Sequence, residues 1–91
     1  MYFALSYEYP PDVLERRAPL RADHLALARE YHAAGKLLLA GAYDPPAEGA
    51  LLLFRADSAA DVEAFVARDP YVQKGLVVRH RIRPWSVVVG G

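Results

Sequence analysis

The chain has 91 residues, with 11 basic and 11 acidic side chains, a formal net charge of zero and no cysteine. The balanced charge and the lack of a basic stripe argue against a nucleic-acid partner, and the lack of cysteine excludes disulfides, thiolate catalysis and cysteine-ligated zinc. No apolar run approaches the roughly 20 residues that a bilayer-spanning helix needs, so we expect no membrane partner and a soluble, cytoplasmic protein. The length predicts one domain over residues 1–91.

The hydrophobic fraction is high for so short a chain. Hydrophobic residues make up 54% of the sequence, whereas a domain of this size buries only about 60–65% of the surface that its unfolded chain exposes. Either the core is unusually rich or some apolar surface faces a partner, and we favour an oligomer.

Residues 2–9 (YFALSYEY) predict the first strand, because they are rich in aromatic side chains and loosely alternate. Pro10 and Pro11 end this strand, since two prolines cannot donate to a ladder. The residues expected on one of its faces are Phe3, Leu5, Tyr7 and Tyr9.

The next segment predicts helical structure. Residues 12–17 predict a short helical turn, Pro19 suits the first position of a longer helix, and Gly35 suits its end. At about 100° per residue, one stripe of this helix comprises Leu20, His24, Leu27, Ala28 and Tyr31.

Residues 36–43 and 49–56 are short apolar runs joined by a turn that contains two prolines. They predict a β-hairpin with both faces covered. The following stretch, SAADVEAFVAR, predicts a second amphipathic helix, in which Ser58 and Asp61 resemble a capping box. This helix must end by Pro70.

Residues 76–84 alternate and predict the fourth strand, and residues 85–91 (WSVVVGG) predict a fifth short strand or a tail. The order β-α-β-β-α-β is the ferredoxin-like arrangement, an α+β fold whose antiparallel sheet carries two helices on one face. The chain has nothing left to cover the other face. We therefore predict a homodimer whose sheets face each other, a dimeric α+β barrel.

His24 is the first candidate for a functional residue, and its position on the apolar stripe permits two interpretations. It could be a packed core histidine that bonds to a carbonyl or carboxylate. It could instead be a general acid or base, because the unperturbed pKa of histidine, about 6.5, lies near working pH.

Asp69 lies in the stretch RDPYVQKG and also permits two interpretations. Aspartate favours the N-cap and proline the first helical position, so Asp69 could cap one helical turn that Gly75 closes. A carboxylate at this position could also orient an imidazole, and the two roles are compatible.

Arg17 and Arg21 lie one turn apart near the start of the longer helix. They could be surface charges, with Arg17 paired to Glu15 or Asp12. They could instead form a clamp for the anionic group of a substrate.

The three histidines, His24, His32 and His80, are not expected to form a metal site, because no two of them have a useful ligand spacing. The sequence also lacks the glycine-rich phosphate motifs and the nucleophile elbow. We therefore expect neither a metal nor a cofactor.

Two long stretches, LERRAPLRADHLALAREYHAAGKLLLAGAY and RDPYVQKGLVVRHRIRPW, resemble the YCII-related (YciI-like) family. The shared features are R-x-x-H-L at residues 21–25, G-K-L-L-x-A-G ending at Gly41, D-P-Y-V-x-x-G at residues 69–75 and a late I-x-P-W. Many members have proline after this glycine, where this chain has Ala42 and Tyr43.

The resemblance implies a dimeric α+β barrel with a histidine–aspartate pair in a pocket, which corresponds to His24 and Asp69. A few relatives are described as dehydrochlorinases of chlorinated aromatics. The enzyme hypothesis is that His24 acts as general acid or base on a small aromatic or carboxylated molecule while Asp69 orients its ring. Tyr71 would line the pocket or donate a hydrogen bond, and Arg17 or Arg21 would bind an anionic group.

The competing hypothesis is a non-catalytic module that binds or carries a small molecule in the same pocket, with the histidine–aspartate pair purely structural. A haem or flavin monooxygenase role also occurs on dimeric barrels, but it rests on fold analogy alone. No axial-ligand signature singles out one histidine, so this third role ranks last.

Overall fold

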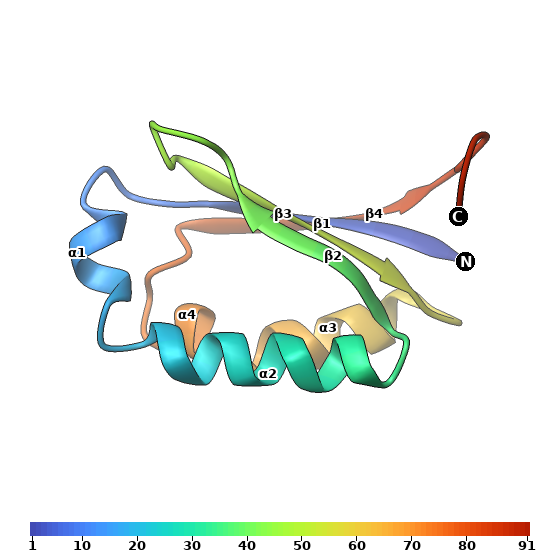
Figure 1. Cartoon of the computed structure of the whole chain (residues 1–91), viewed down its shortest axis with the longest axis horizontal. Coiled ribbons are helices and arrows are strands. Elements are labelled where there is room, and N and C mark those ends of the chain that lie inside the picture. Colours follow the sequence, from blue (N-terminus) through green and yellow to red (C-terminus); the bar gives the residue numbers. More distant parts are fainter.

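The computed structural model describes residues 1–91 and contains a four-stranded antiparallel sheet in the order β2-β3-β1-β4 (Figure 1). The elements in chain order are β1 (Tyr2–Glu8), α1 (Val13–Arg17), α2 (Arg21–Ala33), β2 (Leu37–Ala42), β3 (Gly49–Arg55), α3 (Ala59–Arg68), α4 (Pro70–Gln73) and β4 (Arg79–Trp85). The short helices α1 and α4 are additions to a βαββαβ order, so the ferredoxin-like α+β fold predicted from the sequence is confirmed. None of the helices is both long enough and apolar enough to span a bilayer.

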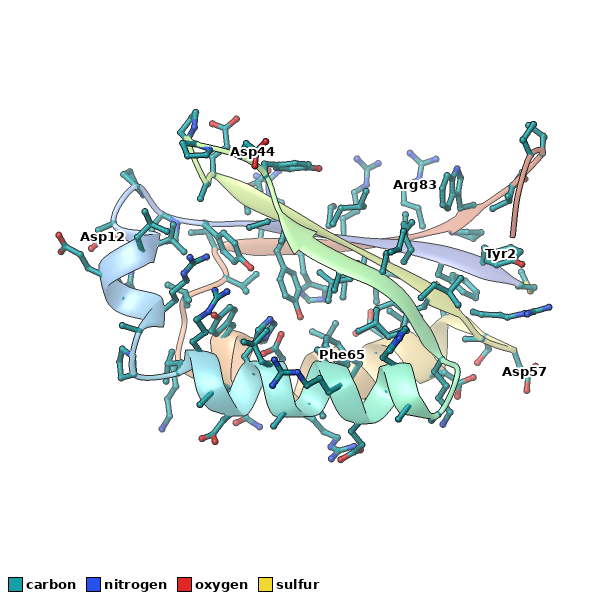
Figure 2. The ribbon with its side chains drawn as sticks, in the orientation of Figure 1. Tyr2, Asp12, Asp44, Asp57, Phe65 and Arg83 are labelled. Atoms are coloured by element: carbon teal, nitrogen blue, oxygen red, sulfur yellow. The ribbon has the colours of Figure 1, made fainter.

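The core lies between one face of the sheet and the helices α2 and α3 (Figure 1). Alternate residues of β1 point into it, and Phe3, Leu5 and Tyr7 are each no more than 2% exposed. Phe65 of α3 lies between the helices and the sheet (Figure 2) and packs edge-on against Phe54, with ring centroids 5.1 Å apart. This burial fixes the register of β1, because a slip of one residue would turn these side chains to the other face.

The opposite face of the sheet carries no helix (Figure 1). Arg83 points from this face away from the helices (Figure 2). The exposed hydrophobic side chains on the same face include Leu39, Leu51 and Trp85, which are 68%, 37% and 47% exposed. Apolar and arginine side chains therefore share one uncovered surface.

The longer helix begins later than the sequence predicts. It starts at Arg21 rather than at Pro19, because the backbone N–H of Leu20 donates to the carbonyl of Arg17 at 2.9 Å and closes α1. The break between α1 and α2 turns Arg17 and Arg21 onto separate helices. Both nevertheless lie at the same cleft, as described below.

The last strand also begins later, at Arg79 rather than at residue 76. The N–H groups of Leu76 and Val77 both donate to the carbonyl of Tyr71, at 2.9 and 3.1 Å, so they close α4 instead of joining the ladder. Residues 86–91 form no strand, which decides between the two predicted alternatives in favour of a tail.

The capping box predicted for the second helix is wrong. Ser58 occupies the N-cap position of α3, but its side chain makes no capping hydrogen bond. The N–H of Asp61 instead donates to the backbone carbonyl of Ser58 at 3.2 Å. The acceptor for this N–H is therefore the carbonyl of Ser58 and not its side-chain hydroxyl.

Candidate active site

Asp69 is positioned by the break between α3 and α4. Its backbone is extended (φ −72°, ψ 119°), because Pro70 follows and disfavours a helical conformation in the residue before it. The side chain accepts a hydrogen bond from the backbone N–H of Tyr71 at 3.0 Å. Gly75, with φ of +74°, follows α4 in the left-handed conformation that glycine adopts most easily. The predicted N-cap is therefore confirmed, and it holds the carboxylate in one place.

His24 and Asp69 are 45 residues apart in sequence and in direct contact in the fold. Nδ1 of His24 lies 2.8 Å from Oδ1 of Asp69. The Asp69 side chain is 0% exposed and the His24 side chain 11% exposed. The sequence permitted this contact without establishing it, since it depends on α2 and α4 packing side by side.

Tyr7 is a member of this group that the sequence did not single out. Its hydroxyl donates to the other carboxylate oxygen, Oδ2 of Asp69, at 2.7 Å. Burial raises the pKa of the Tyr7 phenol far above its ordinary value, and the adjacent Asp69 carboxylate raises it further. The phenol therefore stays protonated and remains a donor. The available signal was a tyrosine on the buried face of β1, since buried tyrosine hydroxyls usually find a partner.

The hydrogen bonds to Asp69 assign the proton on the His24 ring. An ionised carboxylate only accepts hydrogen bonds, and Asp69 already accepts from Tyr7 and from the N–H of Tyr71. His24 is its third donor, so the ring carries its proton on Nδ1. Nε2 makes no hydrogen bond within the chain and is left with a free lone pair.

The His24 ring is also held from one side by Tyr71. The two rings are stacked, with centroids 3.8 Å apart and planes 4° from parallel. The edge of Tyr9 meets Tyr71 at 6.2 Å and 81°. The imidazole is therefore fixed both by its hydrogen bond to Asp69 and by aromatic contact.

A cleft of about 260 Å³ opens beside His24. Its polar lining comes from His24, Tyr9, Tyr71, Arg17 and Arg21. The rest of its wall consists of small or apolar residues, namely Leu25, Ala28, Ala40, Gly41, Ala42, Ala50 and Leu52. The cleft thus joins an apolar wall to a few convergent polar groups, which is typical of small-molecule sites.

Neither arginine of the cleft forms an ion pair within the chain. Asp12, one of the surface partners considered for Arg17, pairs instead with Arg16 at 3.7 Å. Burial raises the pKa of the Tyr9 phenol, and the positive charges of Arg17 and Arg21 oppose that shift. The cleft therefore holds two positive charges that no neighbouring carboxylate neutralises.

The hydroxyl of Tyr71 is buried and has no hydrogen-bond partner. Burial raises the pKa of this phenol, and Arg21 and Arg17 lower it, so both guanidinium groups lie near the hydroxyl. Arg21 nevertheless stays outside hydrogen-bond geometry. Because buried polar groups are usually paired, this unpaired hydroxyl of a cleft-lining residue is an exception that a functional role would explain.

The sequence profile of the YCII-related domain matches residues 1–86. The chain belongs to the YCII-related family.

Two relatives of this YCII-related chain are informative. An uncharacterized protein of Haemophilus influenzae is 29% identical over 97 residues, covering 97% of this chain and 99% of that protein. The solved structure of 5-chloro-2-hydroxyhydroquinone dehydrochlorinase (TftG) from Burkholderia phenoliruptrix, in complex with 2,5-dihydroxybenzoquinone, superposes with a TM-score of 0.80. It shares 26% sequence identity, and the match covers 94% of each chain.

The other two histidines of this family member lie outside the cleft. Nδ1 of His32 is 2.7 Å from the carbonyl of Leu37, and Nε2 of His80 is 3.8 Å from a carboxylate oxygen of Glu63. No three histidine, aspartate or glutamate side chains gather closely enough to hold a metal ion.

Proposed function

We propose that this YCII-related chain binds a small anionic, hydroxylated aromatic or quinonoid molecule and moves a proton at Nε2 of His24. The reaction class is elimination or isomerisation. One observation carries the proposal, namely the position of the His24 ring. Its Nδ1 lies 2.8 Å from Oδ1 of Asp69, and its Nε2 has no partner in the chain. His24 lines a cleft that also holds two unpaired arginines.

The arginines and Tyr71 would bind the ligand. Arg17 and Arg21 attract an anion, and the planar guanidinium group suits a carboxylate or phenolate oxygen. The unpartnered hydroxyl of Tyr71 donates to a second oxygen. The small side chains of the alanine-rich wall would leave room for a flat ring.

His24 would then act on the bound ring. Its Nε2 takes a proton from an O–H or C–H group, and the electron pair left behind forms a new C=O or C=C bond. In an elimination the leaving group departs with the electrons of its own bond, so atoms and charge balance without an electron acceptor. In an isomerisation Nε2 returns the proton at another position. Asp69 stabilises the imidazolium that forms in between.

The chemistry of the solved relative supports this substrate class. That protein is a dehydrochlorinase, and its ligand is a dihydroxylated quinone. The hydroxyl group of a hydroxyquinone is conjugated to a carbonyl like that of a carboxylic acid, so it ionises readily. Such a ligand matches a cleft with two positive charges and an apolar wall.

A non-catalytic binding module remains the second proposal. One observation favours it, namely that Asp69 already serves as the N-cap of α4 and is wholly buried with Tyr7. A network of this kind could be retained for packing alone. The two proposals differ in what the loss of the His24 imidazole does to turnover.

We expect Arg21→Gln to weaken binding of 2,5-dihydroxybenzoquinone about tenfold, because one charge-assisted contact is lost. Binding should also weaken as salt is added, since part of the attraction is electrostatic. Calorimetric titration measures both effects. Arg16→Gln is the matched control, because Arg16 faces Asp12 rather than the cleft. Equal affinities in the two variants, or no binding by the unchanged protein, would count against the proposed ligand class.

We also propose that two copies pair through the uncovered face of the sheet. The exposed Leu39, Leu51 and Trp85 would be buried there, which removes apolar surface that this short chain cannot cover itself. Sedimentation at micromolar concentration should give a species of twice 10.1 kDa. A persistent monomer would contradict the pairing and leave the cleft proposal untouched.

A further inference from the structure

We propose that Tyr7 is a positioning residue that holds the Asp69 carboxylate and lowers the affinity of the His24–Asp69 pair for a proton. The expected effect of Tyr7 on the titration of the pair in the free protein follows from the geometry of the hydrogen bonds. The expected effect of Tyr7 on the pH dependence of turnover rests on the proposed function.

The contact between Tyr7 and Asp69 joins the central strand of the sheet to the break between α3 and α4. The two residues are 62 positions apart, and their oxygens are 2.7 Å apart. Tyr7 is 2% exposed and Asp69 is 0% exposed, so water does not compete for this hydrogen bond. Bonds of this length are typical of a hydroxyl that donates to a charged oxygen.

The two oxygens of Asp69 have different partners. Oδ1 accepts from His24 and from the backbone N–H of Tyr71. Oδ2 accepts from Tyr7 and from no other group in the chain. Tyr7 therefore fixes the rotation of the carboxylate about its own bond, which keeps Oδ1 directed at Nδ1 of His24.

The same hydrogen bond reduces the basicity of the carboxylate. A donor to a charged oxygen stabilises the charged form. Removing that donor leaves more uncompensated negative charge beside the imidazole, which favours the imidazolium. Because the two groups interact strongly, the observable quantity is the titration of the pair. Loss of the Tyr7 hydroxyl should therefore move that titration to higher pH.

The other groups that face the pair do not change when Tyr7 is altered. Arg17 of α1 and Arg21 of α2 carry positive charges and line the same cleft as His24. Tyr9, which follows β1, and Tyr71 of α4 face it as phenols, and burial raises the pKa of each, so both stay neutral. A shift seen only after substitution of Tyr7 can thus be assigned to the missing hydroxyl.

The test is a titration of His24 in the free protein, followed by NMR of its ring nitrogens. In Tyr7→Phe the midpoint should rise by about half to one pH unit. Tyr2→Phe is the control, because Tyr2 lies on the same strand but faces away from the helices, and its midpoint should not move. An unchanged or lower midpoint in Tyr7→Phe overturns the inference, as does a ring that keeps one protonation state throughout the folded range in both proteins.

A second variant keeps the test decisive if Tyr7→Phe does not fold. Site-specific replacement of Tyr7 by 3-fluorotyrosine preserves the shape and makes the phenol a stronger donor. The midpoint should then fall, opposite to the direction expected for Tyr7→Phe. A purely structural role of Tyr7 would not produce shifts of opposite sign, so a rise or no change with 3-fluorotyrosine overturns the inference.

Turnover provides a separate outcome. If the proposed function is correct, the acidic limb of the kcat/KM profile should shift in Tyr7→Phe by the same amount as the NMR titration. If the unchanged protein has no turnover, the proposed function fails while the titration still decides the role of Tyr7.

Discussion

The Asp69→Asn variant should lose turnover about 10³–10⁴-fold while keeping its fold. Asparagine has the shape of aspartate and is nearly as good an N-cap, so α4 should remain capped. The negative charge beside Nδ1 of His24 is lost, however, and with it the hydrogen-bonded counter-charge of the imidazolium. The amide can also donate to Nδ1, which would place the ring proton on Nε2 and block the base.

The stability of Asp69→Asn should fall modestly, by about 1–3 kcal/mol, because the buried hydroxyl of Tyr7 loses its charged acceptor. Chloride release from 5-chloro-2-hydroxyhydroquinone measures turnover, and thermal unfolding measures stability. Asp61→Asn serves as the control, since Asp61 is exposed in the first turn of α3 and does not line the cleft. Turnover in Asp69→Asn close to that of the unchanged protein would contradict the role given to Asp69.

His24→Gln should reduce turnover about 10²–10⁴-fold and leave binding of 2,5-dihydroxybenzoquinone within a few-fold of its original value. Glutamine can still donate to Asp69, so the buried carboxylate keeps a partner, but an amide does not accept a proton at working pH. The ligand is held by the arginines and Tyr71, which are unaltered. A large effect on kcat with a small effect on affinity would identify His24 as the acid or base.

His32→Gln is the matched control for this variant, because His32 lies on the same helix but outside the cleft. If His24→Gln retains turnover, His24 is not the acid or base. If instead the unchanged protein binds the quinone without turning over any substrate of this class, and His24→Gln is only less stable, the binding-module proposal is favoured.

The fold could be predicted from the sequence because local patterns and topology agreed. The alternation in β1 and the stripe on α2 identified the buried faces, and the order of elements identified the sheet. The errors lie at element ends. The N–H groups of Leu20 and Leu76 donate to the carbonyls of Arg17 and Tyr71, which shifts the starts of α2 and β4. A pattern of apolar residues does not specify which carbonyl a backbone N–H group bonds to.

The candidate site could be predicted only in part. His24 and Asp69 came together through a family resemblance, and the N-cap role of Asp69 followed from Asp-Pro alone. The role of Tyr7 could not be predicted, since its contact with Asp69 depends on how β1 packs against the α3–α4 break. Arg17 is left unpaired because Asp12 pairs with Arg16, which lies four residues farther along the same helical turn.

The most direct test of the central claim is an experimental crystal structure of the protein with bound 2,5-dihydroxybenzoquinone. We expect the ring in the cleft beside the alanine-rich wall, with an oxygen about 3 Å from Nε2 of His24. Another oxygen should meet Arg17, Arg21 or the hydroxyl of Tyr71. A ligand that binds elsewhere, or that lies in the cleft with no atom within hydrogen-bond distance of Nε2, would contradict the account.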